Sequence, residues 1–208
     1  KIVLNFGRNL RFKPKYIYSP SSRVELIDIL QKHNNGKIRV VASKHSWSDL
    51  IETEDVLIDM SHFDYIRVQE KNHGTTVTVG AGCKVKRLLA ELSRKGLTIP
   101  SVGLIAEQTI AGATATGTHG SGKHSLSHYI ESLQIACFDE TGKSAKIIDI
   151  SEGESLQAAR CSLGCLGVVV ELTLPCIPQY FVQEKSTFCK TIEEVLVLEK
   201  QAPLQQFF

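Results

Sequence analysis

Residues 100–122 read Pro100-Ser-Val-Gly-Leu-Ile-Ala-Glu-Gln-Thr-Ile-Ala-Gly-Ala-Thr-Ala-Thr-Gly-Thr-His-Gly-Ser-Gly122. From position 101 to position 128 the chain is rich in Gly, Ala, Thr, Ser and His and contains few large apolar side chains. Glycine lets a backbone approach an oxyanion closely, so such a loop can present several N–H groups to one ligand. This stretch is therefore a candidate site for a ligand that carries a phosphate group.

The end of the stretch has the glycine and lysine spacing of a nucleotide-binding P-loop, from Gly117 to Lys123. That motif ends in a Ser or Thr whose hydroxyl holds Mg²⁺, and this chain has His124 there. The motif also follows a buried strand, whereas residues 111–116 are small and polar. A nucleoside-triphosphate-binding domain is thus an alternative that two of its own requirements disfavour.

Three histidines occur close together in this part of the chain: His119, His124 and His128. On a helix, His124 and His128 would share one face, as two ligands of one metal ion require. The spacing fixes no third ligand. Hydrogen-bonded or solvent-facing histidines are the preferred interpretation, and we expect no metal site.

Two further motifs lie upstream. Gly80-Ala-Gly82 stands between an expected strand and an expected helix, but Val85 occupies the third glycine position of a dinucleotide fingerprint. We interpret it as a tight strand-to-helix turn. His45-Ser-Trp-Ser48 directly follows another expected strand, where exposed N–H groups commonly meet a ligand. From these residues alone, His45 is either a ligand-site residue or a loop histidine with satisfied hydrogen bonds.

The chain as a whole mixes helical and strand patterns. Apolar residues at helical spacing predict helices over residues 20–32, 85–92, 156–161 and 192–200. Alternating or β-branched runs predict strands over residues 38–42, 56–60, 65–69, 75–79, 131–139, 146–150 and 168–174, and another from Tyr180. Residues 1–20 are expected to be extended. Because hairpins occur among the helices, the expected fold class is α+β.

Composition excludes several classes of protein. The 208 residues are 42% apolar and 22% charged, which is ordinary for a soluble protein of one large domain or two small ones. Lys and Arg number 24 against 22 Asp and Glu, and this balance argues against a nucleic-acid partner. Apolar runs such as Val168–Val170 are far shorter than the ~20 residues of a membrane span, so none is expected.

The six cysteines form no Cys-x-x-Cys pair and predict free thiols in a reducing compartment, which favours the cytoplasm. No signal peptide is visible at the first residues, and the chain does not start with Met.

Four segments together resemble flavoproteins of the vanillyl-alcohol-oxidase type, which carry a PCMH-type FAD-binding domain. Residues 39–49, Arg39-Val-Val-Ala-Ser-Lys-His-Ser-Trp-Ser-Asp49, resemble the pyrophosphate loop, and residues 100–122 resemble the second flavin loop. The family's third segment is resembled by two runs of this chain, Ala159-Arg-Cys-Ser-Leu-Gly-Cys-Leu-Gly-Val-Val169 and Thr173-Leu-Pro-Cys-Ile-Pro178. With Asn5-Phe-Gly-Arg-Asn-Leu-Arg-Phe12, the likeness is strongest to the sugar-1,4-lactone oxidases, with alditol oxidase nearby, and covers about residues 5–208.

The resemblance implies a two-part FAD-binding domain over residues 1–178, divided at about residue 70, with FAD between subdomains 1–70 and 71–178. Residues 179–208 would begin a second domain that caps the flavin and binds substrate. The implied FAD-binding residues are Ala42, Ser43, Lys44, His45 and Ser46 at the diphosphate, Ser101, Thr109, Gly112, Thr116, Gly117, Thr118, His119 and Gly120 at the flavin and ribityl chain, and Val168 and Val169 at the adenine.

His45 stands where many family members bond a histidine to the 8α-methyl carbon of FAD. A neutral imidazole nitrogen is a competent nucleophile for that carbon, so the resemblance implies a covalent 8α-histidyl FAD. The family loop is usually glycine-rich before this histidine, whereas this chain has Ala42-Ser43-Lys44. We expect the Lys44 side chain to point to solvent.

The implied function is that of an FAD-dependent oxidoreductase acting on CH–OH donors, an aldonolactone-oxidase-like enzyme. A small-molecule sugar lactone or polyol would lose a hydride to FAD, and O₂ or another acceptor would reoxidise the flavin. Family members are much longer, so this chain is expected to be the FAD-binding part, without catalytic residues of its own. The alternative from another class is a non-catalytic interaction module that keeps the fold without flavin.

Overall fold

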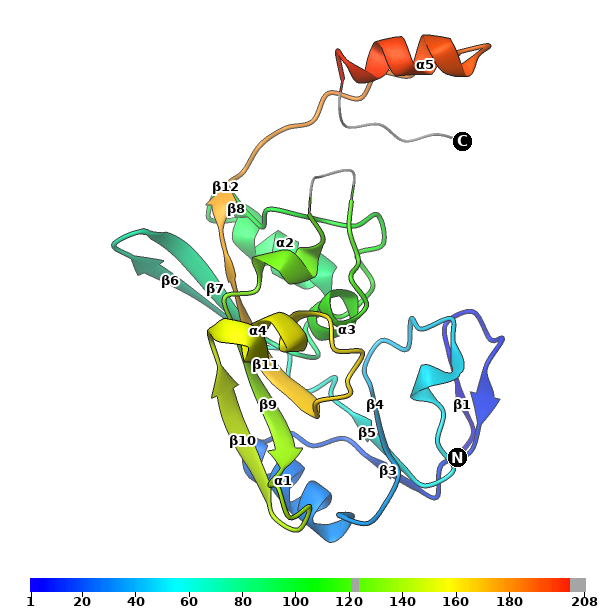
Figure 1. The fold of residues 1–208 in the computed structure, drawn as a ribbon, viewed down its shortest axis with the longest axis vertical. Helices are drawn as coiled ribbons and strands as arrows, with labels where there is room; N and C mark the ends of the chain where they lie inside the picture. Colours follow the sequence, from blue (N-terminus) through cyan, green and yellow to red (C-terminus); the bar gives the residue numbers. More distant parts are fainter. Residues whose placement is uncertain (121–123, 203–208) are drawn as a thin grey trace.

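The computed structural model describes residues 1–120 and 124–202. Two lobes lie side by side, a smaller one from the N-terminal third of the chain and a larger one that follows it (Figure 1). Both lobes combine helices with sheets, which confirms the expected α+β class.

The smaller lobe is built on a parallel sheet of three strands in the order β3-β5-β4. These strands are β3 (Tyr16–Tyr18), β4 (Ile38–Val41) and β5 (Val56–Asp59), with the 3₁₀ helix η1 (Asp49–Ile51) after β4. Helix α1 (Arg23–Lys32) connects β3 to β4, and Ser22 caps its N-terminus with a hydroxyl that accepts a hydrogen bond from the N–H of Glu25. Its apolar face packs on the sheet, as the helical spacing predicts.

An N-terminal hairpin, residues 3–12, flanks this lobe. Its strands β1 (Val3–Leu4) and β2 (Arg11–Phe12) pair antiparallel, and Val3 and Phe12 are buried in a cluster that includes Leu57 of β5. The expected extended segment 1–20 thus contains three short strands.

The larger lobe is built on an antiparallel sheet of five strands in the order β10-β9-β11-β7-β6. The strands are β6 (Ile66–Lys71), β7 (Gly74–Gly80), β9 (Ser132–Phe138), β10 (Ala145–Ile150) and β11 (Val168–Pro175). One face packs against helices α2 (Val85–Ser93), α3 (Ile110–Ala115), α4 (Gly153–Arg160) and η2 (Leu126–Tyr129). A pair of short strands, β8 (Leu97–Thr98) and β12 (Ile177–Pro178), lies beside α2.

Strand β11 contributes to the cores on both faces of this sheet. Val168 and Val170 pack with residues of α1 in the smaller lobe, whereas Leu172 and Leu174 pack under α2 and α3. Residues of equal parity face one side of a regular strand. The β-bulge between Val169 and Glu171 shifts the register, so even-numbered residues after the bulge point to the opposite face of the sheet from those before it. One strand therefore packs against the cores on both faces and connects the two lobes.

Two expectations differ from the structure. No strand starts at Tyr180: residues 179–190 carry no helix or strand and leave Phe181 and Phe188 exposed. They lead to α5 (Ile192–Glu199), which buries none of its residues and lies apart from the lobes in Figure 1. Helix α3, by contrast, forms where small side chains predict only a loop.

Candidate functional site

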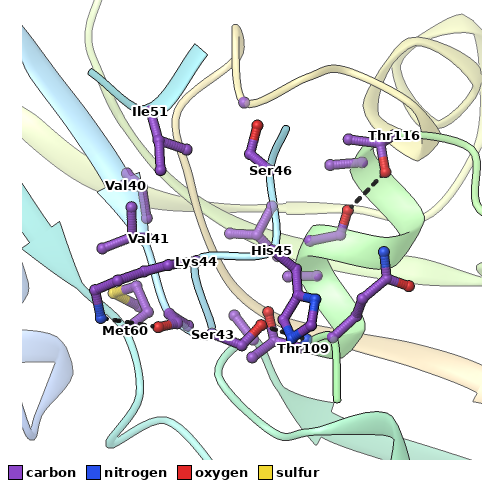
Figure 2. Close-up of a pocket in the computed structure, with 18 of the residues that line it drawn as sticks. Val40, Val41, Ser43, Lys44, His45, Ser46, Ile51, Met60, Thr109 and Thr116 are labelled. Carbon is purple, nitrogen blue, oxygen red and sulfur yellow. Dashed lines mark hydrogen bonds between the residues drawn. The ribbon is translucent and has the colours of Figure 1, made fainter. Parts of the chain in front are cut away.

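A pocket opens where the two lobes meet. It is bordered by the loop after β4 in the smaller lobe and, in the larger lobe, by α3 and the loop before β11 (Figure 2). Its lining comprises Val40, Val41, Ala42, Ser43, Lys44, His45, Ser46, Leu50, Ile51, Met60, Ala81, Gln108, Thr109, Ala111, Gly112, Ala115, Thr116, Leu163, Gly164, Gly167 and Val169.

Lys44 shapes the loop after β4. Its φ of 57° lies in the left-handed region, which residues other than glycine seldom occupy. The Lys44 ammonium group lies 3.0 Å from a carboxylate oxygen of Asp59 and 3.2 Å from the carbonyl oxygen of Ala42. The expectation that this side chain points to solvent was wrong, because Asp59 ends the adjacent strand β5 and offers a carboxylate that is 18% exposed.

The loop after β4 turns its carbonyl groups to the N-terminal hairpin. The carbonyl oxygens of Lys44, Ser46 and Trp47 each accept a hydrogen bond from hairpin residues. The backbone N–H groups of residues 43–46 donate no hydrogen bond to any residue that the structure describes. A buried or half-buried N–H group needs an acceptor, so this loop can bind a ligand rich in anionic oxygens.

His45 is half-buried and lines the pocket. Its imidazole ring stacks on the ring of Phe6, with centroids 4.3 Å apart and an interplanar angle of 16°. In Figure 2 the ring points toward the side of the pocket that carries Thr109.

The second segment reaches the pocket through α3. The backbone N–H of Thr109 donates to the hydroxyl of Ser43 over 3.2 Å, which joins the two lobes at the pocket. Gly112 and Thr116 follow along α3, and both line the pocket. Residues 110–115 therefore form a helix and not the buried strand of a P-loop; Ser121, Gly122 and Lys123 of that pattern lie outside the described residues.

The third segment supplies the loop before β11. Leu163, Gly164 and Gly167 all have positive φ angles and line the pocket. A Cβ on Gly167 would overlap the carbonyl oxygen of Ala136, so this close approach requires glycine.

Nine of the fifteen residues that the resemblance implies line this pocket: Ala42, Ser43, Lys44, His45, Ser46, Thr109, Gly112, Thr116 and Val169. The other six are not among its lining residues: Ser101, Gly117, Thr118, His119, Gly120 and Val168. Ser101 is buried and donates its hydroxyl to the carbonyl of His124 over 3.1 Å, and the Val168 side chain is buried in the core under α1.

Sequence reasoning about single side chains missed the apolar lining, such as Leu50, Ile51 and Met60. Apolar residues of this kind give no chemical signal of a site. The pocket also includes Leu163, Gly164 and Gly167, which lie inside the third flavin-like segment. The two glycines were the sequence signal that this loop could approach a ligand.

The histidines farther along the second segment form no metal cluster. The rings of His124 and His128 stack with centroids 4.0 Å apart. Within residues 1–120 and 124–202, no group of three or more His, Cys, Asp or Glu side chains could hold a metal ion.

Comparison with known proteins identifies the family of this chain. The family described as "FAD binding domain" matches residues 14–147. This chain belongs to that family. Its cofactor is FAD, and the expected kinship with sugar-lactone oxidases is confirmed by the relatives that follow.

Three curated relatives match this FAD-binding domain over most of its length. A long-chain alcohol oxidase of an uncultured marine euryarchaeote is 45% identical over 204 residues, covering 98% of this chain and 43% of that protein. L-gulonolactone oxidase of Mus musculus is 32% identical, covering 92% and 44%. L-gulono-1,4-lactone dehydrogenase of Mycobacterium tuberculosis is 33% identical, covering 88% and 43%. The chain therefore spans less than half the length of these relatives.

The solved structures that match show the same fold. A solvent-stable cholesterol oxidase superposes with a TM-score of 0.77 at 19% identity, over 85% of this chain and 37% of that one. Among the helices that the structure describes, none combines the length and the hydropathy needed to span a bilayer.

The residues of the pocket fit FAD. The N–H groups of residues 43–46 lack acceptors among the described residues, and a diphosphate supplies anionic oxygens. The small side chains of Ala111, Gly112 and Ala115 leave room for a planar ring system beside α3. Bound FAD would also bridge the two lobes, as Ser43 and Thr109 already do.

Proposed function

We propose that the protein carrying this FAD-binding domain oxidises the CH–OH group of a small-molecule sugar lactone or polyol, with O₂ or another acceptor regenerating the flavin. The observation that carries the proposal is the convergence of three flavin-loop segments on one pocket, in a chain whose relatives include L-gulonolactone oxidase and L-gulono-1,4-lactone dehydrogenase. Bound FAD supplies the hydride acceptor, and the protein supplies orientation and electrostatics.

The pocket suggests a role for each of its three segments. Backbone N–H groups of residues 43–46 would hold the diphosphate. Thr109, Gly112 and Thr116 would line the ribityl chain and the flavin, and Val169 would meet the adenine end. Ser101, Gly117, Thr118, His119, Gly120 and Val168 would then shape these loops from outside the pocket.

His45 is the proposed covalent attachment point for the 8α-methyl carbon of FAD. Support comes from its place in the pocket and from the absence of a hydrogen bond between its ring nitrogens and any described residue. The test is acid precipitation of the purified protein, followed by absorbance of pellet and supernatant. Flavin that stays with wild-type protein and is released in His45→Ala supports the bond; flavin in the wild-type supernatant refutes it while leaving FAD binding intact. Protein that contains no flavin and binds none on addition would favour the interaction module.

The donor is tested with a panel of L-gulono-1,4-lactone, D-arabinono-1,4-lactone, an alditol and a long-chain primary alcohol. A long-chain alcohol is the second candidate, favoured by the relative at 45% identity. Preferential reduction of the flavin by a lactone or alditol supports the first proposal, and preferential reduction by the long-chain alcohol replaces it with the second.

We also propose that residues 1–178 form the FAD-binding domain and that residues from 179 onward begin a second domain. The exposed apolar residues after Pro178 and the unburied helix α5 support this division. The proposed location is a reducing compartment such as the cytoplasm, supported by six cysteines that are all free thiols.

A further inference from the structure

The N-terminal hairpin contacts the loop after β4, which carries His45, at three carbonyl groups. The backbone N–H of Phe6 donates to the Lys44 carbonyl oxygen over 3.0 Å. The side-chain amides of Asn5 and Asn9 donate to the carbonyl oxygens of Ser46 over 2.9 Å and of Trp47 over 3.1 Å. These contacts join segments about 40 positions apart in sequence, since Asn5 and Ser46 are separated by 41.

Asn5 is the fixed centre of this arrangement. The residue is only 3% exposed. Its amide nitrogen donates to Asn9 and to Ser46, and its amide oxygen accepts the N–H of Leu10 over 3.1 Å. A buried amide with its donors and acceptor engaged has one stable orientation, because any rotation leaves buried polar atoms unpaired.

Phe6 is the aromatic neighbour of the His45 ring. The two rings stack at 4.3 Å, and Trp47 packs edge-on against Phe6 at 4.6 Å. No described residue makes a hydrogen bond to either nitrogen of His45, although such bonds usually set the orientation of a functional histidine. The stack covers one face of the imidazole, and the Phe6 ring does not block the lone pair and the N–H of the two nitrogens, because these lie in the plane of the imidazole ring.

We propose that Phe6, held by the N-terminal hairpin, is a positioning residue that fixes the His45 ring for bond formation with FAD. The inference rests on the proposed covalent role of His45. Formation of the nitrogen–carbon bond replaces one C–H bond of the 8α-methyl group and the imidazole N–H. The two hydrogens would pass to the flavin ring as two protons and two electrons, and the electron acceptor of the proposed reaction would take them up. Residues 3–12 lie outside the part of the chain that the family match covers.

The first experiment mixes flavin-free protein with FAD and follows the growth of acid-stable flavin fluorescence on the protein. Phe6→Leu keeps an apolar side chain and removes the stacked ring, whereas Phe6→Tyr keeps the ring. We expect Phe6→Leu to slow attachment by about 10- to 100-fold, the scale of misplacing a reacting group, and Phe6→Tyr to stay within about 3-fold of wild type. The affinity for FAD before attachment should change little in either variant.

A second readout reports the stack itself. Protons above an aromatic face resonate upfield, so the His45 ring signals, identified by their loss in His45→Ala, should be shifted upfield in wild type and Phe6→Tyr and not in Phe6→Leu. Tyr16→Leu is the matched control, because Tyr16 is a similarly exposed aromatic residue of the same lobe whose ring does not contact His45. It should leave both readouts at wild-type values.

Each outcome decides one proposal. Equal attachment rates in wild type and Phe6→Leu would overturn the positioning role and leave the His45 link intact. Wild type without acid-stable flavin would refute the link, and the ring signals would then decide whether Phe6 positions His45. If Phe6→Leu does not fold, Asn9→Ala removes both the bond from Asn9 to the Trp47 carbonyl and the bond from the Asn5 amide to Asn9. An unchanged attachment rate in Asn9→Ala would then count against the hairpin.

Discussion

The ammonium group of Lys44 lies 3.0 Å from a carboxylate oxygen of Asp59, and Lys44 itself occupies the left-handed backbone region. A non-glycine residue in that region costs about 1–2 kcal/mol. The ion pair across the ends of β4 and β5 offsets part of this cost, so the chain can follow a turn that usually requires glycine. The loop that holds residues 42–46 in the pocket therefore depends on Asp59.

We expect Asp59→Asn to loosen this loop. Lys44 is 30% and Asp59 18% exposed as side chains, so loss of the pair should lower the free energy of unfolding by about 1–2 kcal/mol. The dissociation constant for FAD should rise as well. Both are measured by urea unfolding and flavin titration. Glu107→Gln is the control: Glu107 pairs with Lys84 and Lys86 at a more exposed position, and we expect no comparable effect. Equal effects of the two changes would contradict the role of Asp59.

Gly112→Ala should separate FAD binding from stability. Gly112 lies within α3, where Ala is favoured over Gly by up to about 1 kcal/mol. Beyond its own helix backbone and chain neighbours, a Cβ there would come within 4 Å of one described atom, the hydroxyl oxygen of Thr109 at 3.2 Å, and it would stand in the lining of the pocket. Thermal stability should therefore hold or rise while flavin affinity falls.

The contrasting variant is Gly142→Ala in the turn between β9 and β10, where φ is +70°. Apart from its two chain neighbours, no described residue has an atom within 4 Å of a Cβ at this position. Strain alone should lower its stability without changing flavin affinity. If Gly112→Ala binds FAD like wild type, the assignment of α3 to the flavin site fails.

Tyr65 makes the protein sensitive to alkali. Burial, and then its hydrogen bond of 2.6 Å to Glu171, raise the pKa of Tyr65 from 10.0 to about 12. The folded state thus keeps a proton that the unfolded state loses, so this stabilisation is complete below pH 10 and is lost as pH rises from 10 to about 12.

Melting temperatures of wild type and Tyr65→Phe across that range test the effect. The wild-type curve should fall more steeply, and absorbance should show one of the five tyrosines ionising late. Burial also raises the pKa of Cys83 and of Cys176 to about 11, but these thiols act equally in both proteins. Parallel curves for the two proteins would rule out Tyr65 as the cause.

Local patterns predicted most of the long helices and strands, and the motifs contain nine of the residues that line the candidate site. Helix α1 was predictable because Ser22 can cap it and its apolar residues recur at helical spacing. Helix α3 was not, since Ala, Gly and Thr carry little periodic signal even though Ile110, Ala113 and Thr114 are buried. The bulge in β11 was also hidden, because it depends on pairing with a strand about 35 positions earlier in the chain.

The candidate site also combines features that the sequence shows with features that only the fold creates. Glycine-rich segments and His45 were visible as motifs, whereas the ion pair of Lys44 with Asp59 and the stack of Phe6 on His45 join residues that only the fold brings together. No pattern within one segment encodes such contacts.

Gly82→Ala should be the most damaging single substitution in the Gly80-Ala-Gly82 turn. A Cβ on Gly82 would overlap the carbonyl oxygen of Met60 and lie 2.8 Å from its carbonyl carbon and 2.9 Å from the Cα of Ser61. All three atoms belong to the backbone directly after β5, and the N–H of Gly82 also donates to the Phe63 carbonyl over 2.9 Å. The glycine therefore serves close packing between the lobes, which agrees with a turn and not with a dinucleotide fingerprint.

Because backbone cannot move aside cheaply, we expect Gly82→Ala to lower the free energy of unfolding by about 3 kcal/mol or more, in the range of severe overpacking. Gly7→Ala is the matched control: its Cβ would lie 2.6 Å from a ring carbon of Trp47, but that side chain is 65% exposed and can swing outward. Its loss should stay below about 1 kcal/mol, as is usual for surface substitutions. Urea unfolding of both variants decides the matter, since similar losses would mean that Gly82 is not held by the neighbouring backbone.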